Sequence, residues 1–311
     1  DYFSNCIDTK SFLTSQQIPS NFYTMKVYVV SAFCMNGSGG NKAGVVLDEF
    51  IPNSNVKIAL AARLGYSETV FLSDSGKADF KLEYFTPKGE VPLCGHATIA
   101  SFIVLRELGR LKKSEYTIET AAGLLKVWID GDGLVFMEQN SPSFFEIIPN
   151  ERLTSCFHPL SLDERFPARI VSTGLRDIIM PISTSNALEI MVPDFKAISI
   201  LSKEMKCIGI HCFALTGSDI DNTPTAICRN FAPLYGINEE AATGTSNCAL
   251  ACYLHDLGIR PQRYIFEQGH NLSCVSRIIV ELKTDTNILG VRVGGDGVVE
   301  GMLDKNTSIW E

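Results

Sequence analysis

The stretch Glu90–Gly109, EVPLCGHATIASFIVLRELG, returns in a related form at Glu239–Gly258, EEAATGTSNCALACYLHDLG. Glycine, alanine and leucine positions match at a constant offset of 149 residues, as from Gly95 to Gly244. A repeat this long is typical of duplicated domains, because the units of a solenoid span about 20–50 residues. The alternative is a chance similarity between two apolar helices that both end at glycine.

Each copy predicts a helix that is apolar on nearly every face, Thr98–Leu108 in the first and Ser246–Leu257 in the second. Such a helix must be surrounded by protein. Short strands such as VYVVSAF, FKLEYFT and LKVWID favour a strongly antiparallel sheet, and a third helix is expected at Asn55–Leu64. The expected fold class is α+β, with two pseudo-symmetric domains, each a β-barrel-like sheet wrapped around a central helix.

The expected domain boundaries follow from breaks in this pattern. Residues 1–24 read as a polar leader or an expression remnant, residues 25–135 as an N-terminal barrel-like domain and residues 150–300 as its C-terminal counterpart. A C-terminal strand that crosses back could complete the first domain. The glycine-rich residues 294–297 are interpreted as a turn.

Composition excludes several classes of function. The net charge of −8 argues against a nucleic-acid or membrane partner. No apolar run of about 18 residues and no signal-peptide core occur, so a cytoplasmic protein is expected. The ten cysteines lie mostly in apolar runs and are expected to be buried free thiols in a reducing compartment. Without C-x-x-C or H-x-x-x-H spacing, no metal site is expected.

The two helix-opening loops are candidate substrate-binding elements. They contain Cys94-Gly95-His96 in the first copy and Thr243-Gly244-Thr245 in the second. The first turn of a helix carries free N–H groups and partial positive charge, so two such ends can hold a carboxylate without arginine or lysine. The alternative is that these residues simply cap their helices.

Three residues are candidate proton carriers: Glu68, His96 and Glu240. A carboxylate that is partly desolvated can have its pKa raised toward neutrality and then serve as base and acid in turn. The alternatives are a solvated strand end for Glu68 and a buried core histidine for His96.

Together these segments resemble the PhzF, or phenazine-biosynthesis-like, family of the diaminopimelate-epimerase-like fold. The motifs that carry the resemblance are Gly40-Asn41, Ser67-Glu68-Thr69, CGHAT, Ser172-Thr173-Gly174, RNFAP, EEAATGTS, Glu267-Gln268-Gly269 and VRVGG at 291–295. The resemblance runs from about Met25 to near the C-terminus.

The resemblance implies a homodimeric, cofactor-independent isomerase with its active site between two domains. Glu68 matches the glutamate that takes a proton from carbon and returns it elsewhere on a small carboxylate-bearing substrate. His96 matches the loop histidine, and Glu240 matches an acidic residue that is usually aspartate. Asn41, the two glycine loops and Gln268 are then expected to bind substrate.

Departures from the family pattern leave the substrate open. Lys42 stands where proline is common, Glu240 is one methylene longer than aspartate, and no arginine follows Gln268-Gly269. A non-catalytic protein that binds a small molecule is therefore one alternative.

A thiol-dependent epimerase is another alternative, because related epimerases use two cysteines. Cys94 occupies the first thiol position, but its repeat mate is Thr243. A threonine hydroxyl is too weak an acid to replace the second thiol. This pairing favours a one-base isomerase that uses Glu68.

Overall fold

The computed structural model describes residues 25–47, 53–217, 223–285 and 288–303 as a mixed α/β fold dominated by strands. Its helices are α1 (Ser54–Leu64), α2 (Gly95–Glu107), α3 (Ser185–Ile190), α4 (Phe195–Met205) and α5 (Gly244–Asp256). The leader expected at residues 1–24 lies outside the described residues. Within the described residues, no helix is long and apolar enough to cross a membrane.

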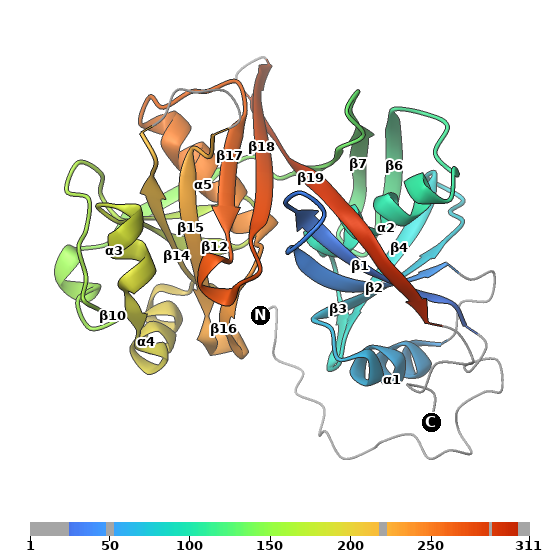
Figure 1. Ribbon diagram of the computed structural model, residues 1–311, viewed down its shortest axis with the longest axis horizontal. Helices are drawn as coiled ribbons and strands as arrows, with labels where there is room; N and C mark the ends of the chain where they lie inside the picture. The colour runs from blue at the N-terminus through green and yellow to red at the C-terminus, as the bar shows by residue number, and fades with distance from the viewer. Residues whose placement is uncertain (1–24, 48–52, 218–222, 286–287, 304–311) are drawn as a thin grey trace.

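One half of the molecule, on the right in Figure 1, contains α1, α2 and strands β1 to β8. These strands are β1 (Val27–Cys34), β2 (Asn41–Leu47), β3 (Glu68–Ser73), β4 (Phe80–Thr86), β5 (Gly89–Val91), β6 (Glu115–Thr120), β7 (Gly123–Ile129) and β8 (Val135–Gln139). The apolar helix α2 contacts β1, β2, β3 and β8, and its residues from His96 to Leu105 are buried. Protein therefore surrounds this helix, as its sequence predicts.

The other half contains α3, α4, α5 and most of the later strands (Figure 1). These are β9 (Ser143–Ile147), β10 (Phe157–His158), β11 (Arg169–Ser172), β12 (Arg176–Pro181), β13 (Val192–Pro193), β14 (Gly209–Leu215), β15 (Ala226–Ala232), β16 (Ile237–Glu240), β17 (Tyr264–Gln268) and β18 (Ser276–Asp285). Helix α5 contacts β11, β12, β14 and β18 and is buried over most of its length. Helices α3 and α4, which the sequence pattern did not predict, pack on β14 and β15.

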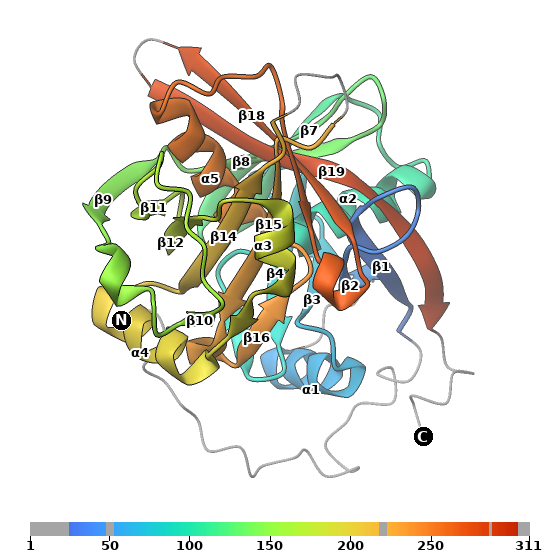
Figure 2. The same ribbon diagram turned by 60° about the vertical axis from the view of Figure 1, so that its left-hand side comes forward.

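Strand β19 (Ile288–Leu303) connects the two halves, as Figure 2 shows. It pairs with β18 and β8 and then with β1, where Leu303 lies opposite Val27. The interpretation of residues 294–297 as a turn is wrong, because these residues lie inside this strand. The glycines permit close packing instead. A Cβ atom on Gly297 would lie 2.3 Å from Ile103 Cδ1 and 2.5 Å from the Ser31 carbonyl oxygen.

Hydrogen bonding joins 17 of the described strands into one sheet, and β10 pairs with β13 separately. Most pairs are antiparallel, as predicted. The pairs β2–β3, β4–β6, β12–β14 and β15–β17 are parallel.

Helices α2 and α5 are equivalent in detail. Each has 13 residues, begins at a glycine and is followed by a glycine with positive φ, 63° at Gly109 and 88° at Gly258. The repeat seen in the sequence is therefore a repeat of structural elements.

Cysteine chemistry also follows the prediction over the described residues. Nine cysteines there are free thiols, and all but the partly exposed Cys274 are buried. Cys6 lies outside the described residues.

Candidate active site

Glu68 is the first residue of β3 and follows the turn that ends α1. Gly65 closes α1 in the left-handed conformation, with φ of 70°. Strand β3 runs parallel to β2 and places Glu68 opposite Ala43, two residues beyond Asn41. The side chain of Glu68 is 20% exposed. The strand register thus holds a partly accessible carboxylate beside the start of β2.

His96, in the first turn of α2, lies between this carboxylate and a thiol. Its Nε2 atom is 3.3 Å from Glu68 Oε2 and 3.3 Å from Ser67 Oγ. Its Nδ1 atom is 3.3 Å from Cys94 Sγ. Partners at both ring nitrogens fix the orientation of a buried imidazole. The structure thus brings Glu68, Cys94 and His96 together.

Glu240, at the end of β16, is held by groups from both halves. Asn41 Nδ2 donates a hydrogen bond to Glu240 Oε1 over 2.9 Å and a second to the Ala242 carbonyl oxygen over 3.1 Å. The Thr243 hydroxyl donates to Glu240 Oε2 over 2.9 Å. Both carboxylate oxygens of Glu240 therefore have fixed partners.

Gln268 is fully buried and supports the loop that carries Thr243. Its Oε1 atom accepts hydrogen bonds from Thr243 N over 3.3 Å and from Asn247 Nδ2 over 2.9 Å. Its Nε2 atom donates to the Glu240 carbonyl oxygen over 2.7 Å and to Thr243 Oγ1 over 3.1 Å. These bonds go to Glu240, Thr243 and Asn247, so Gln268 orders the loop that opens α5.

Sequence reasoning did not single out Ser67 and Asn247 as site residues. Asn247 matches Thr98 in the repeat, and both side chains bond to a carbonyl four residues earlier: Asn247 Nδ2 to Thr243 O over 2.9 Å, Thr98 Oγ1 to Cys94 O over 2.8 Å. Closer comparison of the two copies could have found Asn247. Ser67 belongs to the motif Ser67-Glu68-Thr69, from which only Glu68 was selected as a candidate.

The N-terminal turns of α2 and α5 lack a side-chain cap. Thr243 makes no side-chain hydrogen bond to the N-terminus of α5, and Cys94 makes none of regular capping geometry, although the Ala97 backbone N–H acts on the Cys94 thiol. Gly95 and Gly244 open the helices, and the Thr245 carbonyl accepts a hydrogen bond from Thr173 over 3.1 Å.

Electrostatic interactions connect Glu68, Cys94 and His96 in one half with Glu240 in the other half. Burial raises the pKa of Glu240 above its ordinary value; His96 and the hydrogen bond from Thr243 lower it, and the charge of Glu68 raises it. Burial also raises the pKa of the Cys94 thiol well above its ordinary value, and Glu68 and Glu240 add to this effect. The Cys94 thiol therefore favours its protonated form, and charged groups from both halves act on the same residues.

The side chains of Glu68, Cys94 and His96 form a group that could hold a metal ion. The ligand atoms of Glu68, Cys94 and His96 lie within 4.8 Å of one another. The expectation of no metal site rested on ligand spacing in the sequence, and that spacing misses a set assembled from β3 and α2.

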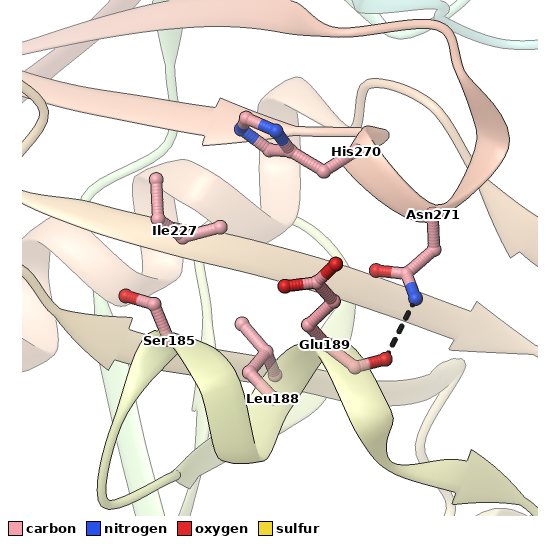
Figure 3. Close-up of a pocket in the computed structure, with 6 residues that line it drawn as sticks. All are labelled: Ser185, Leu188, Glu189, Ile227, His270 and Asn271. Carbon is pink, nitrogen blue, oxygen red and sulfur yellow. Dashed lines mark hydrogen bonds between the residues drawn. The ribbon is translucent and has the colours of Figure 1, made fainter.

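A hollow of about 310 Å³ lies elsewhere, beside α3 and the segment after β17 (Figure 3). Its lining residues are Ser185, Leu188, Glu189, Ile227, His270 and Asn271. None of the predicted site residues lines it. The His270 imidazole has a partner outside the hollow, Glu267, at 3.2 Å.

The fold defines a class that contains PhzF proteins and proline racemase-type enzymes. A hydroxyproline epimerase from Agrobacterium vitis shares the fold, with a TM-score of 0.58 at 14% identity over 90% of this chain and 92% of that one. The likeness is closer to the crystal structure of a Bacillus anthracis phenazine biosynthesis protein of the PhzF family. Its TM-score is 0.81 at 28% identity, over 90% of this chain and 98% of that one.

The chain belongs to the phenazine biosynthesis-like (PhzC/PhzF) family, whose sequence profile matches residues 30–301. A Deinococcus radiodurans relative is 34% identical over 90% of this chain and 95% of its own length. A Bacillus subtilis relative is 32% identical over 88% of this chain and 96% of its own length. Both relatives are named uncharacterized isomerases.

Proposed function

We propose that this protein is a cofactor-independent isomerase that moves a proton on a small carboxylate substrate, with Glu68 as the single acid–base group. The observation that carries the proposal is the position of the Glu68 carboxylate, 3.3 Å from His96 Nε2 at the N-terminus of α2. Membership of a family whose relatives are named isomerases supports the reaction class.

In this proposal the substrate lies in a cleft between two duplicated domains, residues 25–135 and 150–300, each a barrel-like sheet around a central helix. The equivalence of α2 and α5 supports the duplication. The first turns at Gly95 and Gly244, with Thr245, bind the substrate carboxylate through N–H groups and the helix dipoles. Asn41, Cys94, Thr243 and Gln268 complete the substrate-binding set. The hydrogen bonds of Asn41, Thr243 and Gln268 also hold Glu240 in place.

The chemistry is a proton transfer in two steps. Glu68 takes a proton from a carbon of the substrate, the bond electrons delocalise into the substrate, and Glu68 returns the proton to another carbon. His96 positions Glu68 through its Nε2 atom, and Glu240 supplies a second, partly buried carboxyl group. No electron leaves the substrate, so the reaction balances without a cofactor.

The thiol-dependent epimerase is the second candidate, and the contact between Cys94 Sγ and His96 Nδ1 favours it. Two observations count against it. The raised pKa of Cys94 keeps its proton on sulfur, whereas the thiolate is the reactive form. The repeat mate Thr243 uses its hydroxyl to bond Glu240.

The departures from the family pattern affect the site unequally. The Lys42 ammonium pairs with Glu300 at 2.6 Å and its side chain is 50% exposed, so its substitution for proline leaves the catalytic residues alone. Glu240 is one methylene longer than the usual aspartate, so in this proposal it takes up more of the space for substrate.

The proposed protein is a homodimer in the cytoplasm with no nucleic-acid partner. Its free thiols fit a reducing compartment.

Solvent exchange tests this function even though the substrate is unidentified. Amino-acid-like and cyclohexadiene carboxylates are incubated with the protein in heavy water, and loss of C–H signals is followed by proton NMR. We expect at least one carboxylate to incorporate deuterium at carbon. Tight binding of a carboxylate without any exchange would instead establish the non-catalytic alternative.

A further inference from the structure

Three chemically different ligand atoms converge at the start of α2. Cys94 Sγ lies 3.3 Å from His96 Nδ1, and Glu68 Oε2 lies 3.3 Å from His96 Nε2. The three groups are within 4.8 Å of one another, and the His96 side chain between them is only 8% exposed. The arrangement joins a strand end to a helix end, so ligand spacing in the sequence does not show it.

We propose that this group is a site for a thiophilic divalent cation, with Zn²⁺ as its best fit, and that the bound metal inhibits the enzyme. The inhibition rests on the proposed function, whereas the binding does not. A thiol, an imidazole and a carboxylate are the ligands that zinc prefers.

The spacing of the ligand atoms meets part of what zinc requires. Zinc bonds of roughly 2.0–2.3 Å in a tetrahedron place neighbouring ligand atoms about 3.3–3.6 Å apart. Two of the observed contacts are already 3.3 Å. They involve different ring nitrogens of His96, whose lone pairs point away from each other, so a metal bound to Nδ1 beside the Cys94 thiol requires the Glu68 side chain to change rotamer in order to reach it. Glu68 is the long, partly exposed side chain that can make this movement.

The charge of the site also favours a cation. The Glu68 carboxylate lies beside the thiol and the imidazole, 3.3 Å from His96 Nε2. When zinc binds, the Cys94 S–H bond breaks, a Zn–S bond forms, and the proton leaves to the buffer; no electron is transferred. A divalent cation thereby offsets the repulsion between that carboxylate and the new thiolate.

Bound zinc would stop the proposed catalysis, because a Glu68 oxygen that coordinates the metal cannot take a proton from substrate. The metal would also hold His96 and fill space beside the first turn of α2. The site would then report the level of free zinc as a loss of activity.

The test begins with direct binding to the full, reduced, metal-free protein. Zinc is titrated in competition with a chromophoric chelator, and cobalt is used as a probe of thiolate-to-metal charge-transfer absorption. We expect one equivalent to bind with that absorption band. Cys94→Ser and His96→Ala should each weaken binding by at least about 100-fold, and Glu68→Gln by about 10-fold. Circular dichroism melts verify that each variant is folded.

Two matched controls separate this site from adventitious binding. Cys274→Ser removes the partly exposed thiol, and His270→Ala removes a histidine that also pairs with a glutamate. Both variants should bind zinc like the parent protein. Unchanged zinc affinity in folded Cys94→Ser, or no binding by the parent protein, would overturn the site.

Inhibition is measured separately on a carboxylate that undergoes deuterium exchange. One equivalent of zinc should slow the exchange more than about 10-fold, and EDTA should restore it. Exchange that continues at saturating zinc would contradict the inhibition and leave the metal site standing. Thiol-dependent zinc binding in a protein that catalyses no exchange would refute the proposed function alone.

Discussion

Asn41 and Glu240, 199 residues apart in the chain, are joined by a hydrogen bond of 2.9 Å that connects the start of β2 to the end of β16. The same Asn41 nitrogen reaches the Ala242 carbonyl oxygen. One amide group thus ties the half that carries Glu68 to the loop that opens α5.

Replacing the Asn41 amide with a carboxylate tests how much the hydrogen bond to Glu240 contributes. Asn41→Asp converts a donor into a negative group beside Glu240, so we expect deuterium exchange to fall at least about 10-fold. The free energy of unfolding at pH 8 should fall by about 1.5–3 kcal/mol, the usual effect of losing a hydrogen bond to a charged group. Urea denaturation measures the stability. The loss should shrink as the pH is lowered, because protonation of the adjacent carboxyl groups relieves the repulsion; a loss that does not change with pH would contradict the explanation.

Arg229 forms a buried ion pair with Glu239, which precedes Glu240 in β16. Its guanidinium contacts Glu239 at 2.9 Å, with the two side chains 6% and 11% exposed. It also donates to the carbonyl oxygens of Leu188 and Met191 at the end of α3.

Arg229→Met should lower the free energy of unfolding by about 3–5 kcal/mol, because Glu239 would remain as an unpaired buried charge. The control is Arg152→Met, which breaks the exposed pair with Glu204 and should cost less than about 1 kcal/mol. Urea denaturation compares the two. Equal effects would mean that the buried pair contributes no more than a surface pair.

Strand β19 offers a test of its close packing on α2. Gly297→Ala would place a methyl group 2.3 Å from Ile103 Cδ1, so we expect a loss of about 1–3 kcal/mol or more from overpacking. Gly301→Ala, in the same strand, meets nothing within 4 Å and should be nearly neutral. Thermal denaturation followed by circular dichroism compares the variants. A stable Gly297→Ala protein would contradict the described path of β19.

Asp177 makes the free energy of unfolding depend on pH in a defined way. It is buried against Ser246, whose hydroxyl donates to Asp177 Oδ2 over 2.7 Å. Burial raises the pKa of Asp177 from 3.8 to about 7, against the effect of that hydrogen bond. Between these pH values the folded protein keeps a proton that the unfolded chain has lost. This carboxyl therefore lowers stability as pH rises from 3.8 to about 7, with no further change above that range.

Asp177→Asn removes this titration. The stability of the variant relative to the parent should rise with pH by up to about 1.4 kcal/mol per unit across that range. Urea denaturation at pH 5, 6, 7 and 8 measures the difference. Parallel stability curves for the two proteins would contradict a raised pKa at Asp177.

The sequence predicted the elements whose signal is local. Helices α2 and α5 are apolar on nearly all faces, and their repeat revealed them together. Helix α4 was missed although Asp194 supplies an N-cap, accepting a hydrogen bond from Ala197 N over 2.9 Å. Its run of isoleucine, serine and leucine does not stand out against the surrounding strands. Helix α3 spans only Ser185–Ile190, too few residues for a helical period to be read.

The candidate site was predicted in its residues but not in its contacts. The pairing of Glu68 with His96 depends on the parallel register of β2 and β3 and on the direction of α2, which no local pattern encodes. The hydrogen bonds from Gln268 to the loop that opens α5 depend on where β17, which ends at Gln268, lies in the fold. The strand path of residues 294–297 was misread because glycine permits both a turn and close packing of strands.

The most direct test of the central claim compares two single variants in the heavy-water exchange assay. Glu68→Gln keeps the size of the side chain but removes the base, so deuterium incorporation should fall by about 10²–10⁴-fold. Cys94→Ser should retain exchange within about 10-fold of the parent protein. Full exchange in Glu68→Gln together with none in Cys94→Ser would contradict the one-base mechanism and identify a thiol-dependent epimerase instead.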